Sequence, residues 1–316
     1  MGRRRPRGQP VHGWLILDKP YDMTSTEAVN VVKRLFNARK AGHGGTLDPL
    51  ATGVLPIALG EATKTVQWVM EGEKGYLFTV RWGEQRDTDD AEGEVIASSA
   101  RRPTRAEIEA ILPEFTGEIE QLPPRFSAIK IDGERAYDLA RDGEEVKLKP
   151  RQVMIHDLQL VDLPDADHAV FRAVTGKGAY VRALARDMGK RLGCLGHVSQ
   201  LQRTRVGPFT LEDAISLEKL EELRHKDADR KALHEVLLPV ETALADIPAL
   251  ALDGTQASRI VRGQSVILRG AHAPVEEEAV LATWKGRPVA ICTVEAGILK
   301  PRRVFNLGRE DGASRP

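Results

Sequence analysis

Alternating apolar and polar residues predict several short strands in the first two thirds of the chain. Residues 11–17 form an apolar run that ends in Asp18, and residues 76–82 alternate in the manner of a half-buried strand. Two further runs, 153–163 and 169–174, have the same strand-like character. The βαβ alternation that a doubly wound sheet needs is absent, so we predict an α+β fold.

Helix signals lie between these strands. Thr24 with Glu27, and Thr104 with Glu107, have capping-box spacing ahead of segments with helical apolar periodicity. Another helix is predicted beyond Gly178, because apolar residues there repeat at i, i+3, i+4, i+7 and i+11. This stripe consists of Val181, Leu184, Ala185, Met188 and Leu192, and a different face carries Arg182, Arg186 and Lys190.

The pattern of residues along the chain changes after residues 239–248. Residues 216–238 are helix-like and highly charged, whereas the C-terminal part contains short strand-like runs separated by glycines. We therefore predict a second, small β-rich domain of the compact, barrel-like kind over residues 247–316. Its expected strands are residues 265–268, 279–284, 288–294 and 303–307.

Composition favours a globular protein of the cytoplasm. At 316 residues and 41% apolar content, the chain is long enough for about two domains. Its two cysteines are far apart, which favours neither a disulfide framework nor a structural zinc site. We expect the basic residues 1–10 to form a disordered tail. No apolar signal-peptide core follows them, so we do not expect secretion. No apolar run is long enough to predict a membrane span.

Charge alone does not identify a partner. The chain has 46 basic and 46 acidic residues, whereas a nucleic-acid-binding protein is expected to carry a basic surplus. The basic residues are nevertheless clustered, for example at residues 33–40, 147–151 and 182–191, and acidic residues gather at 84–94. The pattern is compatible both with a mixed, solvated surface and with a separate RNA-binding face.

Residues 42–53 carry the strongest candidate chemistry. They contain four glycines and a single carboxylate, Asp48, and Pro49 follows it directly, which favours a bend that displays the Asp48 side chain. An Asp-Pro pair also commonly starts a helical turn, so the local pattern leaves a purely structural role open. No phosphate-binding GxxxxGK[ST] motif is present. Residues 87–93 fail the calcium-loop pattern, and we interpret them as a strand connection near the active site.

Several short motifs stand in order along the chain: Leu17-Asp18-Lys19-Pro20, Gly42-His43, Leu47-Asp48-Pro49-Leu50-Ala51-Thr52-Gly53-Val54-Leu55-Pro56-Ile57, Gly60-Glu61-Ala62-Thr63-Lys64, Asp87-Thr88 with Asp90 and Gly93, Lys177-Gly178 with Tyr180 and Arg182, and Gly193-Cys194 with His197. Together they resemble the TruB family of bacterial tRNA pseudouridine-55 synthases. The resemblance implies a pseudouridine-synthase domain over residues 11–246, with a mixed, mainly antiparallel sheet and flanking helices. It also implies an RNA-clamping insertion at about residues 121–151. Residues 247–316 are similar, more weakly, to PUA RNA-binding modules.

By this resemblance, three residues carry the chemistry. Asp48 is the expected catalytic aspartate, because breaking the bond between N1 and C1′ develops positive charge on the sugar. A carboxylate can capture that charge covalently or remove the C2′ proton. Arg182 is the expected partner that keeps Asp48 ionised. Tyr76 is expected to stack on the uracil, with its hydroxyl where the C5 proton leaves.

Three more residues are implied as contacts to the RNA. Tyr180 and Leu201 complete the expected base pocket, although an aromatic residue at a helix start and an ordinary core leucine would also explain them. His43 is expected to fill the gap that the flipped nucleotide leaves, at a stacking energy of about 1 to 3 kcal/mol. A histidine in a glycine loop is equally compatible with a simple turn residue.

The implied substrate is the T-arm stem-loop of tRNA. The family needs neither a metal nor an organic cofactor, and we expect a monomer with no obligatory protein partner and no membrane association. Two alternatives stay open: a guide-RNA-dependent synthase of the same superfamily, and a non-catalytic tRNA-binding or tRNA-folding protein. Two residues depart from the family pattern. Asp22 replaces the usual glycine in a position where a left-handed turn suits Asp, and Arg86 replaces a common threonine and is expected to add a phosphate contact.

Overall fold

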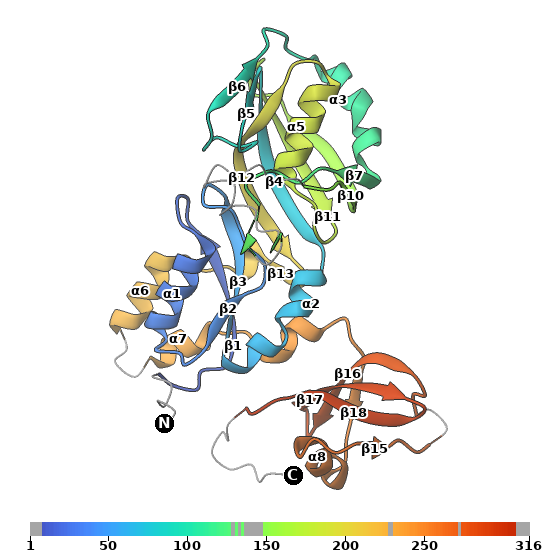
Figure 1. Ribbon diagram of the computed structural model, residues 1–316. Coiled ribbons are helices and arrows are strands. Elements are labelled where there is room, and N and C mark those ends of the chain that lie inside the picture. The colour runs from blue at the N-terminus through green and yellow to red at the C-terminus, as the bar shows by residue number, and fades with distance from the viewer. Residues whose placement is uncertain are drawn as a thin grey trace.

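The computed structural model describes residues 8–127, 130–131, 134–135, 148–226, 230–270 and 273–307. Within these residues the chain forms a nine-stranded sheet and a separate five-stranded sheet (Figure 1). Helices cover parts of both sheets. The fold is therefore α+β, as the sequence predicts.

The larger sheet has the strand order β1-β3-β12-β4-β11-β10-β7, with β2 paired to β3 and β13 paired to β12. All its pairs are antiparallel except β12 with β3, so the expected mixed, mainly antiparallel sheet is confirmed. The predicted strands correspond to β1, β4, β10 and β11. The bounds are β1 Gly13–Lys19, β2 Ala41–His43, β3 Thr52–Leu59, β4 Lys74–Trp82, β7 Gly117–Gln121, β10 Arg151–Asp162, β11 His168–Thr175, β12 Gly196–Val206 and β13 Phe209–Thr210.

Both predicted capping boxes start a helix. The Thr24 hydroxyl accepts a hydrogen bond from the Glu27 amide at 3.2 Å, and Thr104 and Glu107 make the same arrangement. No helix of the described residues is long and apolar enough to cross a membrane. The helices are α1 Ser25–Leu35, α2 Val66–Glu71, α3 Arg105–Ile111, α5 Val181–Arg191, α6 Leu217–Lys226 and α7 Lys231–Glu235, with short 3-10 turns η1 Gly60–Lys64, η2 Leu112–Phe115, η3 Leu211–Asp213 and η4 Val240–Leu244.

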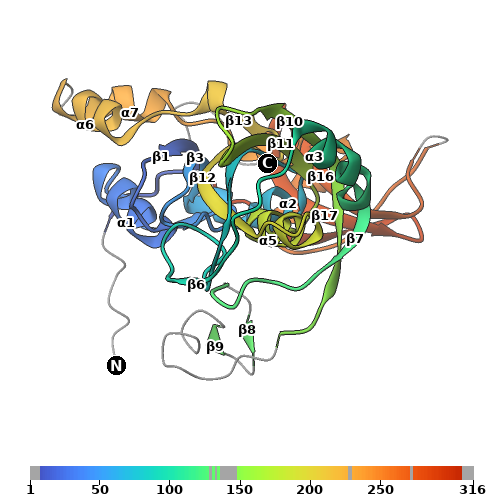
Figure 2. The same cartoon turned by 90° about the horizontal axis from the view of Figure 1, so that it is seen from above.

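The apolar stripe of α5 packs on the half of the sheet formed by β4, β10, β11 and β12. Val181, Leu184 and Met188 are buried there in one cluster with Phe78 and Phe171. The other half of the sheet is covered by α1 and α6, which lie side by side in both views (Figures 1 and 2). The loop that carries Asp48 lies between these two halves.

Two small hairpins extend from the sheet. The first pairs β5 Glu84–Arg86 with β6 Val95–Ser98, and the second pairs β8 Lys130–Ile131 with β9 Glu134–Arg135. Figure 2 shows β8 and β9 standing away from the large sheet. The second hairpin belongs to the predicted RNA-clamping insertion, most of which lies outside the described residues.

The C-terminal sheet has the order β14-β16-β17-β18-β15 and curls around α8. The β-rich character is as predicted, but two details were wrong. Residues 254–261 form a helix that the sequence interpretation missed, although Asp253 and Gln256 make a capping box, and the last strand ends at Val304 rather than 307. The bounds are β14 Ala249–Ala251, α8 Gly254–Val261, β15 Val266–Ile267, β16 Glu277–Trp284, β17 Arg287–Glu295 and β18 Ile298–Val304.

The two sheets share an apolar cluster. Trp14 of β1 is buried in the same cluster as Leu281 and Phe305 from the C-terminal part. In addition, the Lys64 ammonium donates a hydrogen bond to the Val304 carbonyl at 2.7 Å. The C-terminal part is therefore attached by side-chain contacts as well as by the connecting chain.

Gln9, which the sequence interpretation placed in a disordered tail, is held by backbone hydrogen bonds. The Gln9 amide donates to the Asn37 carbonyl at 2.7 Å, and the Gln9 carbonyl accepts from the Arg39 amide at 2.9 Å. These two hydrogen bonds place Gln9 beside the end of α1. Residues 1–7, which include the arginines of the tail, lie outside the described residues.

Candidate active site

Asp48 lies in the loop between β2 and β3. The Asp48 carbonyl accepts a hydrogen bond from the Ala51 amide at 3.1 Å, so the Asp-Pro pair forms a tight turn. The preceding residue is fixed by Ser25, whose hydroxyl both donates to the Leu47 carbonyl and accepts from the Leu47 amide, each at 2.9 Å. This pairing anchors the loop to the first turn of α1 and leaves the Asp48 side chain 36% exposed.

Lys19 holds the other side of the same turn. Its buried ammonium donates to the carbonyls of Pro20, Met23 and Pro49 at 2.8, 2.7 and 3.0 Å. Burial lowers the pKa of Lys19 to about 8, and the charge of Asp48 opposes this shift. The three donors of the ammonium are thus all used, and one of them fixes the residue that follows Asp48.

The structure brings Arg182 and Asp48 together, as the family resemblance implies. Arg182 is the second residue of α5, and its Nε lies 2.9 Å from Asp48 Oδ2 while Nη2 donates to Oδ1 at 3.3 Å. The arginine side chain is only 6% exposed. Arg182 is therefore a buried residue of α5 and not a surface arginine.

Arg182 has further partners inside the protein. Its Nη1 donates to the Thr88 carbonyl at 3.0 Å and lies 3.6 Å from Asp90 Oδ2, and Nη2 donates to the Phe126 carbonyl at 2.9 Å. Burial would lower the pKa of Arg182, but the carboxylates of Asp48 and Asp90 outweigh it and raise the pKa. The guanidinium is therefore a permanent charge that connects three segments of the chain.

The segment of residues 87–93 belongs to this site more closely than predicted. Besides Asp90 beside Arg182, it provides Asp89, whose carboxylate accepts from Arg186 Nη1 at 2.9 Å. Burial raises the pKa of Asp89 to about 6, against the effect of Arg186. The sequence interpretation placed this stretch near the active site as a connection but gave Asp90 no role. Its signal was the Asp87-Thr88-Asp89-Asp90 run itself.

The two departures from the family pattern have clear structural outcomes. Asp22 adopts a left-handed backbone conformation with a φ of 58°, as predicted. Arg86 Nη1 donates to the Gly93 carbonyl at 2.8 Å, and its Nη2 lies 3.3 Å from Glu84 Oε2. Arg86 thus closes the turn of its own hairpin, and a phosphate contact by Arg86 stays a prediction.

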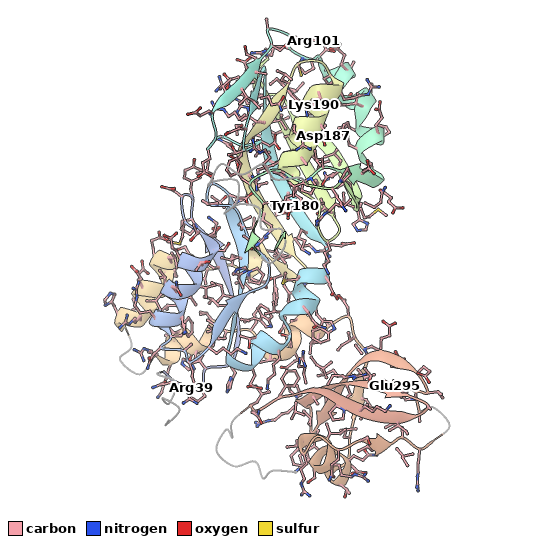
Figure 3. All side chains as sticks on the ribbon, viewed as in Figure 1. Arg39, Arg101, Tyr180, Asp187, Lys190 and Glu295 are labelled. Atoms are coloured by element: carbon pink, nitrogen blue, oxygen red, sulfur yellow. The ribbon has the colours of Figure 1, made fainter. Side chains whose placement is uncertain are left out.

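Tyr180 precedes α5 and is held by its backbone. The Gln121 side chain accepts from the Tyr180 amide at 3.0 Å and donates to its carbonyl at 3.3 Å. Figure 3 shows Tyr180 at the end of α5 that faces the middle of the large sheet, with Asp187 and Lys190 farther along the helix. Gln121, at the end of β7, therefore fixes the start of α5, the helix that carries Arg182.

A small pocket opens beside the ion pair. Leu201 lines it together with Asp48, Asp90 and Arg182. Tyr76 and Tyr180 are half-buried but are not among its lining residues, and His43 lies on β2 opposite Ile57 of β3. Of the six predicted site residues, Asp48, Arg182 and Leu201 therefore line this pocket, and Tyr76, Tyr180 and His43 do not.

Arg203 is a buried residue of the site that the sequence interpretation missed. It lies on β12 directly opposite Tyr76 of β4 and Gly53 of β3. Burial raises the pKa of Tyr76, and the guanidinium of Arg203 opposes this rise. No local pattern singles out this arginine in the sequence, since it stands in an ordinary alternating strand.

Comparison with known proteins identifies the family. The N-terminal domain of the TruB family pseudouridylate synthases matches residues 33–181, and the C-terminal domain of tRNA pseudouridylate synthase B matches residues 182–245. The chain is 62% identical to tRNA pseudouridine synthase B of Bradyrhizobium diazoefficiens, over 96% of this chain and 88% of that protein. It is 55% identical to the protein of the same name from Agrobacterium fabrum, over 96% and 97%.

Solved structures agree on the fold. A chain of a Cbf5-Nop10-Gar1 complex superposes with a TM-score of 0.70 at 25% identity, over 93% of this chain and 84% of that one. A chain of an H/ACA RNP bound to a substrate RNA containing 2'-deoxyuridine gives a TM-score of 0.73 at 23% identity, over 98% and 92%. The family match and the relatives define a pseudouridine synthase, which is an isomerase. Within this class the chain belongs to the TruB family, and the predicted enzyme class, tRNA pseudouridine synthase, is confirmed.

Proposed function

We propose that this chain converts uridine to pseudouridine at position 55, in the T-loop of tRNA. The relatives that share more than half of its residues are named tRNA pseudouridine synthase B. The observation that carries the proposal is the ion pair between Asp48 and Arg182 at the wall of a pocket. A carboxylate that is paired with a buried guanidinium and is still 36% exposed suits attack on a sugar.

The proposed reaction begins with the target nucleotide leaving the RNA stack, because a stacked uracil does not expose N1 and C5. Asp48 then assists cleavage of the N1–C1′ bond, either by bonding to C1′ or by removing the C2′ proton. The detached uracil turns and bonds to C1′ through C5. Arg182 orients the Asp48 carboxylate throughout, and Leu201 and Tyr180 are proposed to contain the base.

Tyr76 is proposed to receive the C5 proton in the last step. Its position on β4, opposite a buried guanidinium, supports this role, because a nearby positive charge stabilises a tyrosine oxygen that carries negative charge. His43 is proposed to occupy the space that the flipped nucleotide vacates. The reaction as proposed uses only side chains of this chain and needs no cofactor.

A guide-RNA-dependent function is the second candidate, because chains of H/ACA assemblies have the same fold. The relative at 62% identity favours the stand-alone enzyme. A non-catalytic tRNA-binding or tRNA-folding protein is disfavoured by the assembled ion pair.

The decisive experiment incubates the purified chain with an unmodified T-arm stem-loop, without guide RNA or other proteins. Pseudouridine is then mapped by chemical labelling and primer extension. We expect multiple turnovers at the single uridine equivalent to position 55, and none when that uridine is replaced by cytidine. Conversion only after addition of a guide RNA, or conversion at another uridine, would refute the proposal.

A further inference from the structure

We propose that Arg203 is a positioning residue for the isomerisation, which joins the Asp48 loop to Tyr76 and holds the Tyr76 oxygen ready to receive the C5 proton. The inference rests on the proposed function and adds a residue to it. Arg203 lies on β12, between β4, which bears Tyr76, and β3, which follows the Asp48 loop.

The guanidinium of Arg203 fixes the backbone of the catalytic loop. Nη2 donates to the Gly45 carbonyl at 3.1 Å, Nη1 to the Thr46 carbonyl at 3.0 Å, and Nε to the Val54 carbonyl at 2.9 Å. These acceptors lie on both sides of Asp48 in the sequence. One side chain therefore spans the loop from its start to its return into β3.

The positive charge of the Arg203 guanidinium is not neutralised by a carboxylate in contact with it. Arg203 is 2% exposed, and among the described residues no acidic side chain forms a salt bridge with it. Burial lowers the pKa of Arg203, and the neighbouring oxygens of Tyr76 and Asp48 oppose this shift. A buried guanidinium whose hydrogen bonds go to neutral carbonyls is costly, so it attracts negative charge that develops beside it.

Negative charge at Tyr76 is what the last step requires. After C1′ has bonded to C5, that carbon carries both the sugar and its original hydrogen. When the C5–H bond breaks, its electron pair forms the C5–C6 double bond, the C6–N1 pair moves to N1, and N1 takes up a proton from solvent. The C5 proton passes to the Tyr76 oxygen while the hydroxyl proton of Tyr76 leaves to solvent water, so that Tyr76 ends the step as a neutral hydroxyl. Arg203 stabilises the negative charge that develops on the Tyr76 oxygen during this transfer.

The test measures the C5 proton transfer itself. Single-turnover rates are compared for a T-arm stem-loop that carries either hydrogen or deuterium at C5 of the target uridine. In Arg203→Lys we expect the rate to fall by about 10- to 100-fold and the hydrogen-to-deuterium rate ratio to rise above that of the wild type, because proton removal becomes limiting. RNA affinity and melting temperature are measured in parallel, and Arg203→Gln is a second variant if the lysine variant does not fold.

Arg205→Lys is the matched control. Arg205 lies two residues along the same strand and is exposed, with Nη2 3.2 Å from Glu73, so its replacement should change neither the rate nor the isotope ratio. In a Tyr76→Phe background, Arg203→Lys should leave the isotope ratio unchanged, since both residues act through one oxygen. A rate loss in Arg203→Lys with the wild-type isotope ratio would overturn the inference.

The failure of the inference can be distinguished from failure of the proposed function. If the wild-type chain forms pseudouridine and Tyr76→Phe raises the isotope ratio while Arg203→Lys does not, only the role of Arg203 is wrong. If the wild-type chain forms no pseudouridine in the stem-loop, the proposed function fails, and the inference fails with it.

Discussion

The guanidinium of Arg182 holds the carboxylate of Asp48 across 134 positions of sequence, with Nε 2.9 Å from Oδ2. The arginine is buried, whereas the aspartate side chain is 36% exposed. The pair therefore consists of a buried residue, Arg182, and a partly exposed residue, Asp48, that lines a pocket. Such an arrangement pairs the carboxylate with a fixed positive charge while leaving it partly exposed to a substrate.

Replacing Asp48 with asparagine is expected to remove turnover and to spare RNA binding. The amide has the shape of the carboxylate but no charge with which to attack the sugar, so single-turnover rates should fall by about 1,000-fold or more. Phosphate contacts supply most of the affinity for RNA, so Kd should stay within a few fold in a filter-binding assay. A variant that retains turnover within about tenfold of the wild type would refute the role of Asp48.

Turnover should decrease as the pH rises through about 8, because Lys19 then loses a proton and with it one of its three hydrogen bonds to the carbonyls of Pro20, Met23 and Pro49. The unfolded chain would hold this proton to about its ordinary pKa of 10.5. Between these values the unfolded state binds more protons, so the contribution of Lys19 to the free energy of unfolding rises with pH. Activity should therefore fall without a matching loss of stability from Lys19.

The control for this prediction is Lys19→Arg, which stays charged across the same range. Its turnover is expected to be lower at neutral pH but to lack the decrease near pH 8. An equal decrease in the wild type and in Lys19→Arg would show that another group is responsible.

Gly53→Ala is expected to destabilise the protein by about 3 kcal/mol, measured by denaturant unfolding. Gly53 has a φ of 96°, which disfavours any residue with a Cβ, and an added Cβ would lie 2.3 Å from the Arg203 carbonyl. Gly42→Ala is the matched control, because a Cβ there meets nothing within 4 Å. Equal unfolding midpoints for the two variants would contradict the argument.

Activity should survive exhaustive treatment with EDTA followed by dialysis. The proposed cleavage depends on the Asp48 carboxylate and the Arg182 guanidinium, which do not require a metal ion for their charge or geometry. The assay uses the T-arm stem-loop refolded in monovalent salt, so that loss of RNA structure does not imitate loss of a cofactor. Activity that returns only with one particular divalent ion would refute the prediction.

Local features of the fold could be predicted because their causes lie close together in the sequence. The capping boxes at Thr24 and Thr104 and the apolar stripe of α5 each depend on residues within three turns of a helix. The left-handed conformation of Asp22 is also a local property. By contrast, α8 was missed because the glycines around it made a strand region the simpler interpretation.

The site could not be assembled in the same way. Asp48 and Arg182 were paired through the family resemblance, since the local pattern of each residue is that of a turn and of a solvated helix face. Asp90 and Arg203 were missed because their importance depends on the strand order, which brings β12 between β3 and β4. Burial of a charged residue by distant segments has no periodic signal in the sequence.

The last prediction concerns how the C-terminal sheet contributes. All residues proposed for the chemistry lie before residue 247, so the C-terminal part is proposed to supply binding energy at a distance from the pocket. Arg259 of α8 and Arg262, which caps it, are exposed and are suited to contact phosphate groups. The double variant Arg259→Glu/Arg262→Glu should raise KM for whole tRNA and leave kcat within about twofold, because removing uniform binding does not change the chemical step.

The salt dependence of binding provides a second measurement on the same variant. Each lost phosphate contact should reduce the slope of log Kd against log salt by about 0.7 to 0.9, so the double variant should have a shallower slope by about one to two. Arg105→Glu is the control, since Arg105 lies on α3, outside the C-terminal sheet. Its Nη1 is 3.2 Å from Glu109. If kcat collapses in the double variant while the fold is intact, the C-terminal sheet positions the substrate for catalysis and is more than a docking module.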